Sequence, residues 1–403
     1  MGMMVHQMDV DTAFLNAELD EDVYIVPPDG MPVPARYNCF KLRKTLYGLK
    51  QAPRKWNENI NTFLTRDLNF YRLQAENCIY IRKQNGKTCI IALYVDDLVI
   101  SGTDLETIAK VKEQLSQRYS MKDLGEVDQL LGCEIIRNNL TGSITVAQRK
   151  YIQEIIKRFL GLSDIVKVST PADQNVNLGK HMCPETPEAS AEMAKVPYRE
   201  AIGCLLWLAM GTRPDICYAV TQVAKFNDNP GPDHWEAVLR IFRYLHGTID
   251  YILEYRTATC NFDNHAPTGC FSPCLEEPDE MNPTGFVDSD HARDPDTRRS
   301  VTGYTFTLAE APIVWQSRQQ VSVALSSMEA EYMAACAATQ EAYWLRMVLV
   351  EIGCRIHKPV ILWEDNQSCI HLAHNPNDHK RSKHIDRQYH YVREQIIAGN
   401  ISL

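Results

Sequence analysis

The sequence predicts a chain of several domains with α/β and α+β folds: an antiparallel sheet with helices, a mainly helical segment and a C-terminal α/β domain. A length of 403 residues is too great for one ordinary hydrophobic core. Two apolar, β-prone runs joined by Asp96-Asp97 predict a hairpin in the first part. From residue 285 onward the patterns indicate three strands, a helix, a strand and a helix, which is an α/β order.

The composition is typical of a folded soluble protein, with 45% hydrophobic and 23% charged residues. No stretch approaches the roughly 18 apolar residues of a membrane span, so we expect no membrane association. The first residues, MGMMVHQMD, lack the basic and then apolar layout of a signal peptide. The chain has 13 cysteines, an odd number, and most of them occur singly within apolar segments. This pattern indicates reduced thiols. We therefore expect an intracellular protein of the cytoplasm or nucleus.

The formal net charge of −9 argues against an indiscriminate nucleic-acid binder. Local basic surfaces are still present, because residues 36–55 contain seven Lys or Arg and no Asp or Glu. A second basic cluster near the C-terminus consists of Lys380, Arg381, Lys383, Arg387 and Arg393. Each run is suited to contact phosphate groups, and a solvated charged face is the alternative.

Three acids in the first part could form one site. If the apolar runs that flank Asp96 and Asp97 are buried, holding these two adjacent anions between them costs free energy unless a cation neutralises them. A plain polar turn is the alternative for this pair alone. Asp9 ends a second short apolar approach, with Phe14 five residues later. Three carboxylates from two strands would hold two Mg²⁺ ions for in-line phosphoryl transfer.

Three ordered motifs carry a family resemblance: MDVDTAFLNAELDEDVYIVPP, LYGLKQAPRKW and LYVDDLVI resemble successive motifs of copia-type retrotransposon reverse transcriptases. The resemblance implies that residues 1–140 form the palm of an RNA-directed DNA polymerase. It also implies that Asp9, Asp96 and Asp97 are its catalytic, metal-binding acids, with two Mg²⁺ or Mn²⁺ ions in the site. The strand expected at Val23–Val26, which Pro27-Pro28 would close, and the helix expected at residues 56–68 belong to this palm.

The same resemblance implies residues that bind the incoming nucleotide. Gln51 is expected at the templating base or the nucleotide, with a turn amide as the alternative. Lys50 and Arg54 suit phosphate groups. Phe14 is expected beneath the sugar, where its ring would exclude a 2′-hydroxyl and favour dNTPs; a core residue would look the same in sequence. Lys122 would assist the triphosphate, and an exposed turn lysine is its alternative.

The middle of the chain shows no catalytic constellation. Thr103 to Glu106 fits a capping box before a helix, and residues 151–160 fit an amphipathic helix. Residues 184–194 indicate a linker or exposed loop, whereas 198–210 are apolar nearly all round and predict a buried helix. YREAIGCLLWLAMGTRPDICYAV resembles the thumb-to-connection region of copia-type polyproteins, which we expect over residues 141–256.

Residues 257–283 are rich in Pro, Asn, Glu and Cys and indicate a linker or an inserted loop. Four potential zinc ligands lie here: Cys260, His265, Cys270 and Cys274. The first cysteine of a zinc-knuckle pair is absent. The four residues are therefore either a zinc site or a chance cluster.

VDSDHARD, SSMEAEYMAA, WEDNQSCIHLA and SKHIDRQYHYVRE together resemble the RNase H domain of the same retrotransposons, over residues 284–403. The resemblance implies four catalytic, metal-binding acids, Asp288, Glu331, Asp365 and Asp386, which would hold two further Mg²⁺ or Mn²⁺ ions. The neighbouring acids Asp290 and Glu329 could be confused with these ligands, and Glu329 is expected to cap the helix instead.

The implied function is RNA-directed DNA polymerase with RNase H activity, and the implied partners are an RNA template, a DNA primer, an RNA–DNA hybrid and dNTPs. The chain starts just before the Asp9 motif, whereas family members carry a fingers region upstream, so we expect the C-terminal piece of a larger polyprotein or an N-terminally truncated copy. The alternative is a remnant that binds nucleic acid with ribonuclease H activity only, or without catalysis.

Overall fold

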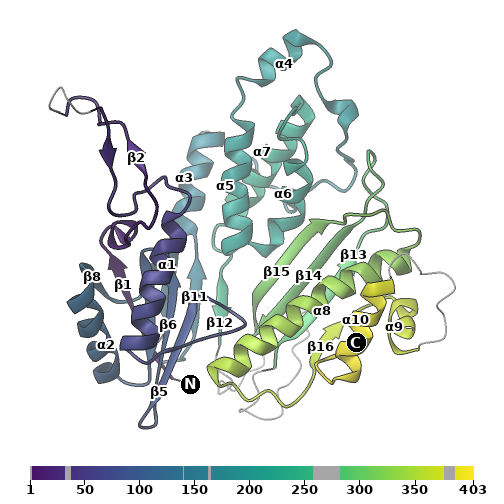
Figure 1. Cartoon of the computed structure of the whole chain (residues 1–403). Helices are drawn as coiled ribbons and strands as arrows, with labels where there is room; N and C mark the ends of the chain where they lie inside the picture. The colour runs from purple at the N-terminus through teal and green to yellow at the C-terminus, as the bar shows by residue number, and fades with distance from the viewer. Residues whose placement is uncertain (1, 32–37, 139, 162–164, 257–281, 376–385) are drawn as a thin grey trace. The chain divides into compact units, whose positions relative to one another are not determined.

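The structure is a computed structural model that describes residues 2–31, 38–138, 140–161, 165–256, 282–375 and 386–403 (Figure 1). The chain divides into two compact units, Met1–Val127 and Asp128–Leu403. The mixed α/β architecture with antiparallel sheets agrees with the prediction. None of the described helices combines the length and apolarity needed to cross a membrane. Cys260, His265, Cys270 and Cys274 lie outside the described residues.

The first unit is built on a six-stranded antiparallel sheet in the order β4-β5-β6-β7-β1-β8. The strands are β1 (Met4–Val10), β4 (Tyr71–Arg72), β5 (Ile79–Gln84), β6 (Lys87–Tyr94), β7 (Asp97–Gly102) and β8 (Met121–Glu126). Strands β2 (Tyr24–Ile25) and β3 (Phe40–Lys41) form a separate two-stranded sheet. The predicted hairpin around Asp96-Asp97 is therefore the β6–β7 pair at the centre of the sheet.

Helices α1 (Ala52–Thr62) and α2 (Leu105–Arg118) share one core with this sheet. Alternate residues of the central strands, such as Met8, Ile91 and Ile100, are buried against Trp56 of α1 and Val111 of α2. A 3₁₀ turn, η1 (Ala13–Asn16), follows β1, and a π-helical turn, η2 (Phe63–Asp67), extends α1. The period-two pattern of the strands thus places one face of the sheet in the core.

The cap of α2 differs from the sequence prediction by one residue. Asp104, not Thr103, is the N-cap, and its carboxylate accepts the main-chain N–H of Thr107 at 2.9 Å. Thr103 instead donates its hydroxyl to Asp104. The carboxylate is the stronger acceptor for the first-turn N–H groups, and it also benefits from the positive end of the helix dipole.

The second unit begins with a four-stranded antiparallel sheet in the order β12-β11-β10-β9. Its strands are β9 (Gln129–Leu130), β10 (Cys133–Arg137), β11 (Ile144–Ala147) and β12 (Leu253–Tyr255). Between β11 and β12 lie α3 (Arg149–Leu160), α4 (Pro187–Met193), α5 (Tyr198–Gly211), α6 (Cys217–Ala224) and α7 (Pro232–Gly247). Helices α3, α5, α6 and α7 share a core of their own.

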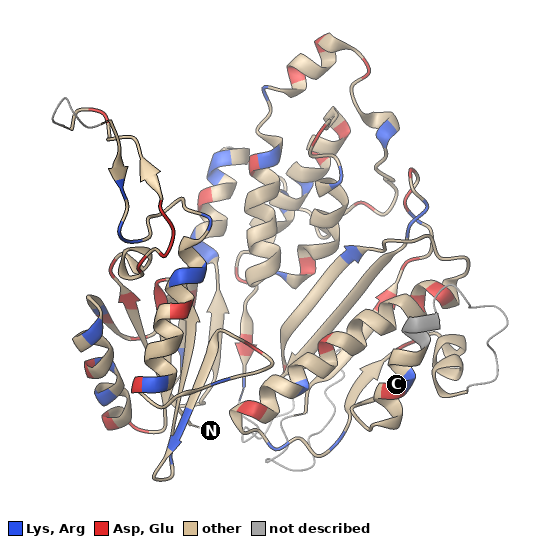
Figure 2. Ribbon diagram, in the orientation of Figure 1, with Lys and Arg blue, Asp and Glu red and all other residues tan. Residues whose placement is uncertain are grey.

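Two expectations for this helical part need correction. Residues 187–193, predicted as part of a linker or loop, form α4, because Thr186 caps the N–H of Ala189 and Pro187 occupies the first turn. Helix α5 is only partly buried, since Trp207 and Met210 are exposed although its other face lies in the core. Figure 2 shows that the charged residues of α5 lie only at its start, so its outer face is apolar.

The C-terminal part of the second unit is a mixed five-stranded sheet in the order β15-β14-β13-β16-β17. Its strands are β13 (Thr284–Ser289), β14 (Val301–Leu308), β15 (Ala311–Gln319), β16 (Val360–Trp363) and β17 (Ile401–Ser402). The β13–β16 and β16–β17 pairs are parallel, and the other pairs are antiparallel. The helices are α8 (Ser327–Ile352), α9 (Gln367–His374) and α10 (Asp386–Ile397). Both α9 and β17 were missed in the sequence, where a single helix after β16 was expected.

Candidate active sites

The three predicted acids of the first unit lie at one end of its sheet. Asp9 of β1 is paired directly with Asp97 of β7 in antiparallel register. Side chains at paired positions point to the same face of a sheet, so these two carboxylates are neighbours. Asp96 precedes β7, and its carbonyl oxygen accepts the N–H of Val10 at 2.8 Å. Sequence-distant segments thus bring Asp9, Asp96 and Asp97 together.

The turn that carries Asp96 is strained and is held from outside. Tyr94 pairs with Asp97, so only Val95 and Asp96 connect β6 to β7. Val95 has φ of +54°, a conformation that a β-branched side chain rarely adopts. Its carbonyl oxygen accepts the indole N–H of Trp56 at 2.8 Å. Helix α1 therefore stabilises the turn conformation from the side of the core.

Each acid of the turn has its own hydrogen-bond donor. The amide of Gln7 donates to Asp97 at 2.9 Å, and the hydroxyl of Tyr47 donates to Asp96 Oδ2 at 3.0 Å. Asp96 Oδ1 is buried and has no partner among the described residues. Burial raises the pKa of Asp9 above its usual value, and the nearby charge of Asp97 raises it further. These carboxylates repel one another, and one buried oxygen has no hydrogen-bond donor within the described part of the chain. Such a group is suited to bind a divalent cation.

The predicted nucleotide-binding residues lie at or beyond the edge of this cluster. Phe14 is half-buried in η1, and its ring lies 4.7 Å from that of Tyr47. Lys122 of β8 is paired with Asp9 in register and forms an ion pair with Asp11 at 3.2 Å. This ion pair raises the pKa of Lys122, so the ammonium is held at the acidic end of the sheet. Lys122 is thus close to the candidate site, not on a remote turn.

Gln51, Lys50 and Arg54 surround the start of α1. Gln51 is the N-cap residue, but its side chain does not cap the helix. Arg54 forms an ion pair with Glu58 at 2.8 Å, one turn along α1. Lys50 is exposed, and no ion pair is found for it within the described parts of the chain. The basic run is therefore partly neutralised by neighbouring acids, because Lys55 also pairs with Asp20.

A second acidic cluster lies in the C-terminal part of the second unit. Ligand oxygens of Asp288, Glu331 and Asp365 all lie within 4.8 Å of one another. Asp288 is near the end of β13, Asp365 follows the parallel neighbour β16, and Glu331 lies in α8, which packs on β13. Among the described residues no other three acids, histidines or cysteines meet this spacing, and Asp9, Asp96 and Asp97 do not.

The second cluster disfavours its own negative charge. Burial raises the pKa of Glu331 to about 8, and the charges of Glu364, Asp288 and Asp365 add to this effect. Burial also raises the pKa of Glu364, to about 7. One oxygen of each glutamate is buried and lacks a partner within the described residues. This donor set fits a divalent cation, which would relieve the repulsion and fill the free acceptor sites.

The neighbouring acids have structural partners. Glu329 accepts the N–H of Leu325 at 2.9 Å while Ser326 caps the N–H of Glu329, so this glutamate takes part in capping the start of α8, as expected. Asp290 accepts the N–H of Val301 at 2.7 Å. Asp386 begins α10, but its side chain lies outside the described part of the structure.

Sequence reasoning missed three residues of these clusters: Gln7, Tyr47 and Glu364. Gln7 lies two residues before Asp9, on the same face of β1, so strand periodicity contained a signal for it. Glu364 directly precedes Asp365, and the sequence pattern alone indicates only that it ends a strand. Tyr47 had no signal by itself, because its contact with Asp96 depends on the tertiary fold.

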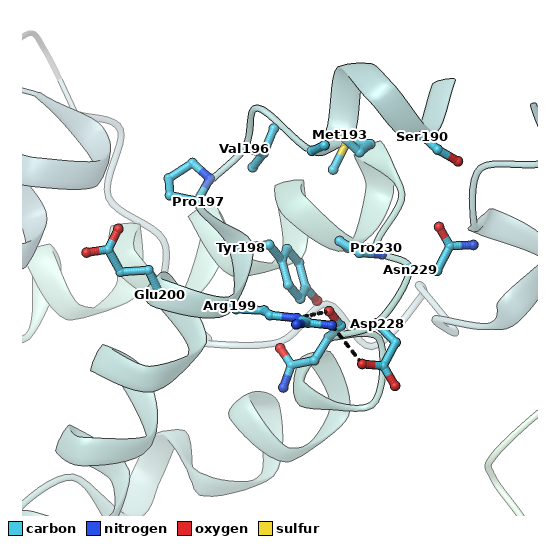
Figure 3. Close-up of a pocket in the computed structure, with 12 residues that line it drawn as sticks. Ser190, Met193, Val196, Pro197, Tyr198, Arg199, Glu200, Asp228, Asn229 and Pro230 are labelled. Atoms are coloured by element: carbon cyan, nitrogen blue, oxygen red, sulfur yellow. Dashed lines mark hydrogen bonds and ion pairs between the residues drawn. The ribbon is translucent and has the colours of Figure 1, made fainter. Parts of the chain in front are cut away.

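An open pocket of about 460 Å³ lies elsewhere in the second unit, around the start of α5 and the loop between α6 and α7 (Figure 3). Arg199 crosses its floor and donates to the Asn227 carbonyl and to Asp228, both at 2.8 Å. Arg199 and Asp228 are thus already paired with one another, and Glu200, which also lines the pocket, pairs with Arg158. The pocket contains none of the predicted site residues.

The chain is similar in sequence to a reverse-transcriptase family and to transposon proteins. The family described as "Reverse transcriptase (RNA-dependent DNA polymerase)" matches residues 1–174. The retrovirus-related Pol polyprotein from transposon TNT 1-94 of Nicotiana tabacum is 40% identical over 98% of this chain, which spans 28% of that polyprotein. A putative transposon Ty5-1 protein of Saccharomyces cerevisiae is 32% identical over 83% of this chain and 100% of its own length.

Among solved structures, a foamy viral protease-reverse transcriptase in complex with dsDNA matches with 12% identity and a TM-score of 0.23, over 96% of this chain and 66% of that chain. This likeness is too low to indicate a shared fold. The sequence matches, by contrast, extend over nearly the whole chain and over a full-length relative. The chain therefore belongs to the family of copia-type retrotransposon Pol polyproteins.

Proposed function

We propose that the chain is the RNA-directed DNA polymerase and RNase H part of a copia-type Pol polyprotein. The polymerase would extend a DNA primer on an RNA template with dNTPs, and the ribonuclease would cut the RNA of the hybrid. The observation that carries the proposal is the direct pairing of Asp9 with Asp97 beside the Asp96 turn, within a region of reverse-transcriptase sequence.

In the polymerase, Asp9, Asp96 and Asp97 would hold the metal ions. Bound divalent cations in either site would increase the nucleophilicity of an attacking oxygen and neutralise charge that develops on the phosphate. Gln7 fixes the orientation of Asp97, and Trp56 fixes the turn. The ring of Phe14 would lie against the sugar and disfavour a 2′-hydroxyl, and Lys122 would balance phosphate charge.

In the ribonuclease, which we propose to be an RNase H-like domain, Asp288, Glu331 and Asp365 would hold the metal ions. Support comes from their convergence within 4.8 Å and from the mixed sheet, in which Asp288 lies near the end of β13 and Asp365 follows its parallel neighbour β16. Asp386 is kept as a fourth proposed ligand. A raised pKa such as that of Glu331 is typical of an acid in a functional site.

A second candidate, ribonuclease activity without polymerisation, also has a specific observation in its favour. The three acids of the second cluster lie close enough together to bind one cation, whereas in the first cluster Asp96 and Asp97 each accept a hydrogen bond, from Tyr47 and Gln7. A chain that cuts RNA but does not extend a primer would match this difference.

One assay separates the two candidates. An RNA template annealed to a DNA primer, with each strand carrying its own label, is incubated with the purified chain, Mg²⁺ and dNTPs. Primer extension together with RNA cleavage supports the full proposal. Cleavage without extension supports the second candidate, and an unchanged primer and an intact RNA would contradict both.

A further inference from the structure

Tyr47 connects the two parts of the candidate polymerase site. Its hydroxyl donates to Asp96 Oδ2 at 3.0 Å. Its ring lies 4.7 Å from the ring of Phe14, with the two planes inclined by 50°. One residue thus contacts both a proposed metal-binding acid and the proposed sugar-contacting ring, and nothing in the sequence motif assigns it a role.

The contact between the rings is held by a buried residue. Thr45 is fully buried, its hydroxyl donates to the carbonyl of Phe14, and its N–H donates to Ala17 at 2.9 Å. Gly48 directly follows Tyr47 and has φ of +95°, which lets the chain turn away towards α1. The segment that carries Tyr47 is therefore tied to η1, so the spatial relation of the two rings is set before any ligand binds.

The ring pair is not part of the hydrophobic core. Tyr47 is 47% exposed, and Phe14 is only partly buried where it packs against the core cluster. Aromatic residues that serve only for stability are usually buried more completely, whereas an accessible aromatic wall beside acids can receive a ligand. A phenol hydroxyl can both donate and accept, so it matches another hydroxyl group.

We propose that Tyr47 is a positioning residue for the incoming nucleotide, with its ring forming a wall of the sugar pocket beside Phe14 and its hydroxyl bonding the 3′-hydroxyl of the sugar. The inference depends on the proposed polymerase function and assigns separate roles in sugar recognition to Phe14 and Tyr47. Phe14 would test the 2′ position by shape, and Tyr47 would test the 3′ position by a hydrogen bond. The ligand class is a 2′-deoxynucleoside triphosphate with a free 3′-hydroxyl.

The chemistry of discrimination gives this idea a measurable form. A site that is built to hydrogen-bond a hydroxyl rejects an analogue that lacks it, because the site's own polar group is then left without a partner. The unaltered chain should therefore use a dNTP better than the matching 2′,3′-dideoxynucleotide. In Tyr47→Phe this preference should fall roughly tenfold, the value expected for one lost hydrogen bond.

The experiment compares kcat/KM for a dNTP, its dideoxy analogue and the matching rNTP in primer extension. Tyr47→Phe should keep the preference for dNTP over rNTP, because a ring still packs beside Phe14. Tyr71→Phe is the matched control, since Tyr71 is an exposed tyrosine in β4 of the first unit, and its variant should keep both preferences. Equal loss for the dNTP and its dideoxy analogue would overturn the inference, because Tyr47 would then act only through Asp96.

A binding measurement provides a readout that does not need turnover. On a primer that ends in a dideoxynucleotide no bond can form, and the affinities for the dNTP and its dideoxy analogue are measured in Ca²⁺. A smaller difference between the two affinities in Tyr47→Phe than in the unaltered chain supports the inference, and an unchanged difference overturns it. Failure of the unaltered chain both to extend primers and to bind dNTPs would remove the polymerase proposal and this inference together, whereas unchanged selectivity in an active variant removes the inference alone.

Discussion

The indole N–H of Trp56 donates to the carbonyl oxygen of Val95 at 2.8 Å, and this hydrogen bond joins helix α1 to the turn that carries Asp96. Trp56 is buried, and Val95 is held at a positive φ that its side chain disfavours. Such strain persists only where the surroundings fix it. The conformation of the acidic turn is thus maintained by a residue of the second motif, LYGLKQAPRKW.

Trp56→Phe should therefore affect the polymerase more than the ribonuclease. The variant leaves the Val95 carbonyl without its donor, which should lower the free energy of unfolding of the first unit by about 1–3 kcal/mol. Primer extension should fall while RNA cleavage is retained, since the second acidic cluster lies in the other unit. Urea unfolding and the double-labelled extension assay measure the two effects. Trp207→Phe, at an exposed position of α5, is the control and should change neither.

Glu331 makes the stability of the metal-free protein dependent on pH. Its pKa is raised to about 8 in the folded chain by burial and by its acidic neighbours, from an ordinary value of 4.5. Between these values the folded state binds more protons than the unfolded state, so stability should fall as the pH rises from about 4.5 to 8. Glu331→Gln removes this titration and should raise the melting temperature at pH 8 by about 2–4 °C.

Magnesium provides the matched test of the same residue. A cation that binds the cluster favours the ionised carboxylates, so Mg²⁺ should raise the melting temperature of the unaltered chain at pH 8. Glu331→Gln should respond less to Mg²⁺ and should lose RNA cleavage despite its greater stability. If the variant melts at a lower temperature than the unaltered chain without metal, the raised pKa is not the dominant effect at this position.

Arg213 connects the ends of two helices in the second unit. It is almost completely buried, and its guanidinium donates two bonds to Asp215, at 2.9 and 2.7 Å. The same group donates to the carbonyl and hydroxyl oxygens of Thr248, just beyond α7. Arg213→Lys keeps the charge but cannot reproduce this planar fork, so we expect a loss of about 2–3 kcal/mol in unfolding free energy.

Arg199→Lys is the matched control for that experiment. Arg199 also pairs with an aspartate, Asp228, but its side chain is 70% exposed. Solvent screens such pairs, so the control should change stability by no more than about 0.5 kcal/mol. If both variants lost a similar free energy of unfolding in urea, burial would not be what makes the Arg213 contacts stabilising.

The sequence predicted local elements well where their patterns were strong. Short apolar runs predicted the strands that carry Asp9 and Asp97, and the similar setting of these acids predicted that they share one site. Short elements with weaker patterns were missed: α4, α9 and β17. Such segments depend on caps and on edge pairing, as in α4, which starts at the Thr186 cap.

Tertiary contacts were beyond the reach of sequence patterns. The Tyr47–Asp96 hydrogen bond joins residues from separate motifs, and the burial of Glu364 depends on how the helices cover β16. Glu329 and Glu331 could be told apart, because hydrogen bonds at the start of α8 hold Glu329 there and the helix then directs Glu331 to the sheet. Local chemistry is therefore readable in the sequence, whereas pairing across elements requires the fold.

The most direct measurement compares two variants in the double-labelled assay: Asp96→Asn and Asp365→Asn. Asp96→Asn should reduce primer extension by roughly a hundredfold or more and leave RNA cleavage intact, and Asp365→Asn should do the reverse. Asp22→Asn and Asp250→Asn, at exposed acids of the two units, serve as controls. Loss of the predicted activity in each variant alone supports two separate acidic sites. Unchanged extension in Asp96→Asn, or unchanged cleavage in Asp365→Asn, would contradict that assignment.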